Sequence, residues 1–223
     1  MKKLRILCLH GYHGSADIMQ NQSNSLVSEL KELADFIYLD APSLAEGDHG
    51  WWHAIEASNK VKGAGVHSTP VSYKGWAKTY EHIVSFFRDN GPFDGVLGFS
   101  QGAALTALLV GLRAPDGIIG AQYPLAFNFA ILVGGFFAND PLLQSLYEAK
   151  DSYDLPSVHI IGRADFIVPL RYSYEVSALF KRPLVIEHNG GHVIDCSERT
   201  RLQLAFFLKE QLDQVKRLSD RSK

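Results

Sequence analysis

Cysteine is scarce in this chain, with only Cys8 and Cys196 among 223 residues. Two thiols do not make the disulfide framework of a small secreted domain. An excess of charge is missing too, because 22 basic and 24 acidic side chains leave a formal net charge of −2. This balance gives no electrostatic reason to expect nucleic acid or an anionic membrane surface as a partner.

Long hydrophobic runs are also absent, since none approaches the ~18 residues of a transmembrane helix. The charged start Met1–Arg5 is similar to that of a signal peptide, but the apolar run Ile6–Leu9 is interrupted by His10-Gly11, so we interpret it as a strand. We therefore expect a cytoplasmic protein without an integral membrane segment. The length and the 46% of hydrophobic residues suit a single domain, residues 1–223, with a substantial core.

Short apolar segments alternate with helix-forming segments along the chain. Strands are expected at residues 4–9, 36–39, 93–99, 127–133, 158–161 and 184–187. Helices are expected at 16–33, at 76–90, after Ser100, at 141–149, at 172–180 and from Ser197 onward. This alternation predicts an α/β fold, in which a mostly parallel sheet of about six strands carries helices on both faces. In such sheets ligands bind outside the carboxyl ends of the strands, so the residues that follow the strands are the functional candidates.

Residues 42–73 show no clear helical or alternating pattern. The segment contains several glycines and the adjacent pair Trp51-Trp52. Long irregular segments inside a compact domain are usually functional or disordered, and two adjacent tryptophans argue against disorder. We expect a lid or a pocket-shaping insertion here.

The segment Gly98-Phe99-Ser100-Gln101-Gly102 fits the pattern G-x-S-x-G. A β-prone stretch precedes it and helix formers follow it, which is the context in which this pattern marks a nucleophilic serine. The turn strains the backbone of Ser100 and lifts its hydroxyl out of the sheet, while side chains at 98 and 102 would collide with a neighbouring strand or helix. The alternative is an ordinary turn that happens to contain a serine.

A serine hydroxyl needs a base to take its proton, and a carboxylate to hold that base. Among nine histidines, His192 follows the last expected strand after two glycines, and Asp165 follows the strand that ends at Ile161. The chain order Ser100, Asp165, His192 is the nucleophile, acid and base order of α/β-hydrolases. Asp140 is a second candidate for the acid. As plain structural residues, His192 would cap the terminal helix and Asp165 would shape a turn.

The oxyanion that forms during acyl transfer needs preorganised hydrogen-bond donors. The backbone N–H of Gln101 is one candidate, because it opens a helix whose dipole favours negative charge. The second is expected from the loop after the first strand, and we choose the N–H of Tyr12. His10 and His13 in that loop could suggest a metal, but two histidines without a third ligand make a weak site. We expect neither a metal nor a cofactor.

Taken together, these motifs resemble the FSH-type family of serine hydrolases, the family of the yeast serine hydrolases and the ovarian-tumour-associated esterase, in the α/β-hydrolase superfamily. The segments that carry the resemblance are Leu7–Tyr12, Tyr38–Pro42, Trp51-Trp52, Gly91–Ala104, Gly162–Asp165 with Val168-Pro169, and Glu187–His192. The resemblance implies a three-layer α/β-hydrolase fold without the first two strands of larger relatives. It also implies Ser100 as nucleophile, Asp165 as acid and His192 as base in the hydrolysis of carboxylic esters, often on acyl chains, with no cofactor.

The leading hypothesis is a serine esterase that acts on a small-molecule acyl ester through an acyl-enzyme intermediate. Its acyl pocket is expected to draw on five aromatic residues, each of which could equally be core: Trp51, Trp52, Phe136, Phe137 and Phe166. The same machinery would serve an acyl thioesterase or a lysophospholipase, and nothing in the sequence separates these activities. Two other classes remain, a catalytically slow ligand receptor on a hydrolase scaffold and an interaction module. The sequence does not indicate the oligomeric state.

Overall fold

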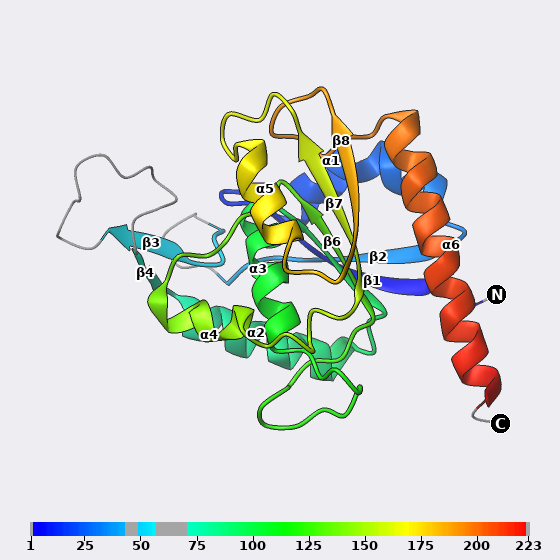
Figure 1. Ribbon diagram of the computed structural model, residues 1–223, viewed down its shortest axis with the longest axis horizontal. Coiled ribbons are helices and arrows are strands. Elements are labelled where there is room, and N and C mark those ends of the chain that lie inside the picture. The colour runs from blue at the N-terminus through cyan, green and yellow to red at the C-terminus, as the bar shows by residue number, and fades with distance from the viewer. Residues whose placement is uncertain (1, 43–48, 57–70, 222–223) are drawn as a thin grey trace.

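A six-stranded sheet runs through the middle of the computed structural model, which describes residues 2–42, 49–56 and 71–221 (Figure 1). The strand order is β2-β1-β5-β6-β7-β8, and every neighbouring pair is parallel. The strands are β1 (Leu4–Leu9), β2 (Ala34–Leu39), β5 (Gly95–Phe99), β6 (Phe129–Val133), β7 (Pro156–Gly162) and β8 (Arg182–His188). The predicted α/β architecture with about six parallel strands is therefore confirmed.

Helices cover both faces of this sheet (Figure 1). They are α1 (Ala16–Leu30), α2 (Trp76–Asn90), α3 (Gln101–Gly111), α4 (Gln144–Tyr147), α5 (Leu170–Ser177) and α6 (Glu198–Arg221), with a 3-10 turn, η1 (Pro141–Leu143), before α4. The side chains of β1 divide between two cores, because successive residues of a strand point to opposite faces. Leu7 and Leu9 pack with α2, α3, α4 and α5, whereas Ile6 and Cys8 pack with α1 and α6.

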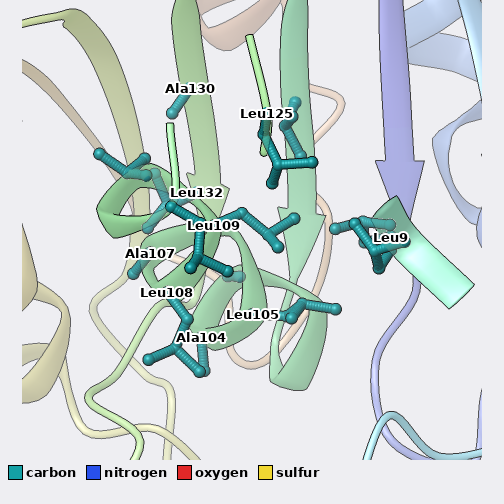
Figure 2. Packing of buried hydrophobic residues seen from close by; sticks show 14 of the residues in the cluster. Leu9, Ala104, Leu105, Ala107, Leu108, Leu109, Leu125, Ala130 and Leu132 are labelled. Carbon is teal, nitrogen blue, oxygen red and sulfur yellow. The ribbon is translucent and has the colours of Figure 1, made fainter. Parts of the chain in front are cut away.

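Helix α3 is buried at all of its positions, which explains why it is apolar all round rather than amphipathic. Figure 2 shows its leucines and alanines packed with Leu9 of β1, Leu125 and residues of β6, among them Leu132. Because α3 begins directly after Ser100, this packing fixes the turn that presents the serine. Helix α3 therefore holds the candidate nucleophile in a fixed position.

A short antiparallel hairpin occupies part of the predicted insertion. Its strands are β3 (His53–Glu56) and β4 (Val71–Lys74), in a stretch without a clear helical or alternating pattern of residues. Two four-residue strands separated by fourteen residues are too short to establish an alternating pattern. Residues 43–48 and 57–70 of the predicted lid lie outside the described residues.

The helices found in the described residues differ in length and polarity. The longest, α6, carries 24 residues and packs one apolar stripe, including Leu204 and Leu208, against the sheet. No helix in this part of the chain has both the length and the apolar content that crossing a bilayer requires.

Candidate active site

Three side chains far apart in the sequence form one hydrogen-bonded chain. His192 Nε2 lies 2.8 Å from Ser100 Oγ, and His192 Nδ1 lies 2.7 Å from Asp165 Oδ2. Ser100 follows β5, Asp165 follows β7 and His192 follows β8, so all three extend from the carboxyl edge of the sheet. The three residues proposed from chain order therefore meet in space.

Ser100 sits in a strained turn between β5 and α3. Its φ of 54° and ψ of −117° lie outside the regions that side-chain-bearing residues normally occupy. The backbone N–H of Ser100 donates to Val133 O at 2.9 Å, and this bond ties the turn to the end of β6. A Cβ added at Gly98 would lie 2.1 Å from Gly102 O, and one at Gly102 would lie 2.0 Å from Leu9 O. The predicted steric reason for both glycines is confirmed.

Pairing between β7 and β8 sets the register of the acid against the base. Gly162 is opposite His188 in the ladder, and two further bonds extend it, from Arg163 N–H to His188 O at 2.8 Å and from Ala164 N–H to Gly190 O at 3.1 Å. The loops that follow the two strands therefore leave the sheet together. Asp165 and His192 are brought face to face by backbone pairing that begins inside the sheet.

Asp165 is held through both of its carboxylate oxygens. Oδ1 accepts the N–H groups of Ile167 at 2.9 Å and Val168 at 2.8 Å, which leaves Oδ2 for His192. The two side chains are largely buried, at 13% exposure for His192 and 3% for Asp165. Since an ionised carboxylate only accepts hydrogen bonds, His192 carries its proton on Nδ1, and its Nε2 lone pair faces the serine hydroxyl.

Packing holds the imidazole of His192 in place. The ring of Phe99 lies against it, with ring centroids 4.9 Å apart. On Gly134, whose φ is +60°, a Cβ would lie 3.2 Å from His192 Cε1. Main chain and an aromatic ring thus leave little room for the base to turn away from Ser100.

The second candidate acid, Asp140, has a structural role instead. Its Oδ1 accepts the N–H of Leu142 at 3.0 Å, and its Oδ2 accepts the N–H of Tyr73 at 2.7 Å. The side chain therefore caps η1 and ties it to the β3–β4 hairpin. Asp165, not Asp140, is the carboxylate that contacts the candidate base.

Both segments expected to supply oxyanion donors border the serine. Gln101 is the first residue of α3, so its N–H has no carbonyl one turn earlier in the helix. The loop after β1 also runs against the serine, since a Cβ on Gly11 would lie 3.2 Å from Ser100 Cβ. The next residue, Tyr12, is 44% exposed, and its hydroxyl lies 3.0 Å from His53 Nδ1.

The side chain of Gln101 has a structural role that the sequence did not suggest. Its Oε1 accepts the N–H of Trp51 at 3.0 Å, and its Nε2 donates to Trp52 O at 2.8 Å. The indole of Trp51 donates to His10 O at 2.8 Å, and the hydroxyl of Thr79 donates to Trp51 O. These hydrogen bonds connect the Trp51-Trp52 segment to α3, to the end of β1 and to α2. No local pattern signals these contacts.

The five aromatic pocket candidates occupy different environments. Trp51 and Trp52 are buried in the core, where Trp52 stacks on Tyr73 with centroids 5.0 Å apart. Phe136 and Phe137 are partly buried against the same core. Phe166, directly after Asp165, is 93% exposed. Ile167 and Val193, which the sequence analysis did not single out, are two exposed apolar residues close in sequence to Asp165 and His192.

The described residues contain no cluster of three or more His, Cys, Asp or Glu side chains arranged to hold a metal ion. His10, one of the two histidines considered as ligands, uses both ring nitrogens on main-chain groups. Nδ1 lies 2.7 Å from Gly11 O, and Nε2 lies 3.0 Å from Ala41 N. Both ring nitrogens of His10 are therefore engaged in hydrogen bonds that hold the loop after β1.

A cavity of about 480 Å³ is lined by charged and polar residues from the β7 and β8 loops and the start of α6. Arg163 pairs with Glu187 at its edge, and Asp195 and Arg199 add one charge of each sign. Because Ser100 does not line this cavity, it is separate from the point where an ester carbonyl would be attacked.

Comparison with known proteins gives concordant matches. A family model described as serine hydrolase (FSH1) matches residues 1–203. An esterase of Caenorhabditis elegans is 35% identical over 218 residues, 95% of each chain. Esterase OVCA2 of Danio rerio is 29% identical over 227 residues, which cover 92% of this chain and 96% of the relative. Among solved structures, acyl-protein thioesterase 2 of Zea mays is similar in fold, with a TM-score of 0.65 over 95% of both chains at 20% identity.

Proposed function

This chain belongs to the serine hydrolase (FSH1) family of esterases, and we propose that it hydrolyses small-molecule carboxylic acyl esters through a triad of Ser100, His192 and Asp165. The observation that carries the proposal is the continuous chain of hydrogen bonds, 2.8 Å and 2.7 Å long, from the serine through the imidazole to the carboxylate. The strained backbone at Ser100 supports it, because strain of this kind persists where function needs the geometry.

In the acylation half-reaction, Ser100 Oγ attacks the carbonyl carbon of the ester while its proton passes to His192 Nε2. The imidazolium that results is stabilised by Asp165, which keeps its own charge. The carbonyl π electrons move to oxygen and form a tetrahedral oxyanion. The tetrahedral species then collapses, the bond to the alcohol oxygen breaks, and His192 returns the proton to the departing alcohol.

The oxyanion is held by the backbone N–H groups of Gln101 and Tyr12. The N–H of Gln101 also lies at the start of α3, where the helix dipole favours negative charge. A single oxyanion donor typically contributes on the order of 3 kcal/mol to catalysis. Deacylation repeats the same sequence, with water as nucleophile and Ser100 as leaving group, and releases the carboxylic acid.

Labelling with a fluorophosphonate and hydrolysis of a short p-nitrophenyl ester test the proposal together. We expect Ser100→Ala to abolish both, and the matched variant Ser28→Ala, on the exposed face of α1, to retain both. Labelling that persists in Ser100→Ala would remove Ser100 as the nucleophile.

The preference for oxygen esters or thioesters is tested separately, because this triad would cleave both by the same steps. A matched pair of substrates with one acyl group, one an oxygen ester and one a thioester, is compared by kcat/KM. Turnover of the thioester alone would replace the esterase assignment with a thioesterase one. A single slow turnover with retained product would instead favour a ligand receptor on this scaffold.

A further inference from the structure

His10 is a buried histidine, 1% exposed, directly after β1. Its Nε2 lies 3.0 Å from the N–H of Ala41, which can only donate, so Nε2 is the acceptor. The proton of the neutral ring is therefore on Nδ1, which donates to Gly11 O at 2.7 Å. Both hydrogen bonds together select one tautomer.

Gly11 O belongs to the same peptide unit as the N–H of Tyr12. In a planar trans peptide the carbonyl and the N–H point to opposite sides, so fixing one fixes the other. Gly11 O is held twice, by His10 Nδ1–H and by Gly14 N–H at 3.0 Å. We propose that His10 is a positioning residue that aims the Tyr12 N–H at the oxyanion by holding this peptide plane. The inference rests on the proposed function.

The position of His10 itself is also fixed. Its carbonyl accepts the indole N–H of Trp51 at 2.8 Å, and its ring lies beside that indole with centroids 5.1 Å apart. Its carbonyl oxygen lies 2.6 Å from where a Cβ on Gly102 would be, at the start of α3. Contacts with the sheet edge and with α3 therefore fix the His10 ring. The ring in turn fixes the loop that carries the Tyr12 N–H.

Burial supports a neutral ring at this position. Desolvation lowers the pKa of His10 below its ordinary value, His49 adds to that effect, and the Gly11 bond and Asp40 oppose it. A protonated ring would present an N–H at Nε2 to the Ala41 N–H, so the bond that sets the ring orientation needs the neutral form.

Substitution by two amides separates the two ring nitrogens. In His10→Asn the side-chain amide N–H falls near the position of Nδ1 and retains a donor for Gly11 O. In His10→Gln the amide reaches the position of Nε2 but leaves Gly11 O without that donor. We expect His10→Ala and His10→Gln to lower kcat by about 10- to 100-fold, less than deletion of an oxyanion donor, with KM within about twofold. His10→Asn should recover most of that loss.

A trifluoromethyl ketone that adds to Ser100 and places an oxyanion in the hole supplies a second readout. Its affinity should fall by the same factor as kcat in each variant. The matched control is His159→Asn, which removes another buried histidine away from the site, on β7, and should leave kcat unchanged. Equal activity of the Asn and Gln variants, or losses confined to KM, would overturn the inference.

The nitrogen-15 shifts of the His10 ring keep the test independent of how the variants fold. Wild-type protein should show protonated Nδ1 and unprotonated Nε2 at neutral pH, and the opposite tautomer would refute the assignment. If the wild type neither hydrolyses esters nor takes the phosphonate at Ser100, the proposed function fails and the role of His10 fails with it. If the wild type hydrolyses esters and takes the phosphonate at Ser100, but His10→Ala has wild-type kcat, only the inference about His10 fails.

Discussion

Replacing Asp165 by asparagine should inactivate the enzyme through the tautomer of His192. Oδ1 of Asp165 accepts two backbone N–H groups, from Ile167 and Val168, and an amide NH2 accepts none. The asparagine oxygen must therefore stay on those two donors, and its NH2 must face His192 Nδ1. Nδ1 then becomes an acceptor, and the ring proton moves to Nε2, where it points at the serine hydroxyl.

A base with its proton on Nε2 cannot take the proton of Ser100. The loss in kcat for this type of substitution is on the order of 10⁴-fold, which corresponds to ~5.4 kcal/mol at 1.36 kcal/mol per factor of ten. Folding stability should change by less than ~1 kcal/mol, because each hydrogen bond of the carboxylate has a geometric counterpart in the amide.

The assay is kcat and KM for a p-nitrophenyl ester, with urea denaturation alongside. The matched control is Asp140→Asn, which also alters an aspartate that accepts two backbone N–H groups but contacts no triad residue. We expect that control to lose ~1 to 3 kcal/mol of stability, since one partly buried N–H loses its acceptor, and to keep kcat within a few-fold. Asp165→Asn with more than a tenth of wild-type kcat would refute the tautomer argument.

Three further predictions concern the surroundings of the triad and the core. Gly134→Ala should lower kcat at least ~10-fold without changing KM, because its Cβ would stand 3.2 Å from His192 Cε1, and wild-type kinetics would exclude that contact. Gln101→Met should cost ~2 to 5 kcal/mol in urea denaturation, since two buried main-chain groups lose their partners, and a cost below 1 kcal/mol would contradict the clamp. Burial lowers the pKa of His159 to about 3, so stability should fall as pH drops below ~6.5, by up to ~1.4 kcal/mol per pH unit, and His159→Asn should flatten that slope. An unchanged slope in that variant would assign the acid sensitivity to other groups.

The sign of the last prediction follows from the direction of the shift. The unfolded chain binds a proton at His159 below pH ~6.5, while the folded chain, with its lowered pKa, does not. Stability therefore rises with pH across this window and is lost as pH falls towards the folded pKa.

Local sterics allowed the candidate nucleophile to be identified from the sequence. A serine at positive φ in a sharp turn between a strand and a helix has close main-chain neighbours, and Gly98 and Gly102 are the residues at which a Cβ would collide with that main chain. The parallel sheet was equally readable, because strands buried on both faces form short apolar runs. The placement of Asp165 and His192 followed from these runs, since residues after parallel strands share one edge of the sheet.

The contacts around Gln101 and His10 could not be predicted, because they join segments that are distant in the sequence and produce no periodic pattern of residues. The sequence determined which residues are the catalytic candidates, because the turn and the strand ends are encoded by their immediate neighbours. Only the tertiary structure decided that Gln101 clamps Trp51-Trp52, that the carbonyl of His10 accepts the indole N–H of Trp51, and that Phe166 faces solvent while Trp51 is buried. A hydrogen bond between segments forty or fifty residues apart forms only after the sheet and α3 have brought them together, and no short stretch of residues specifies that approach.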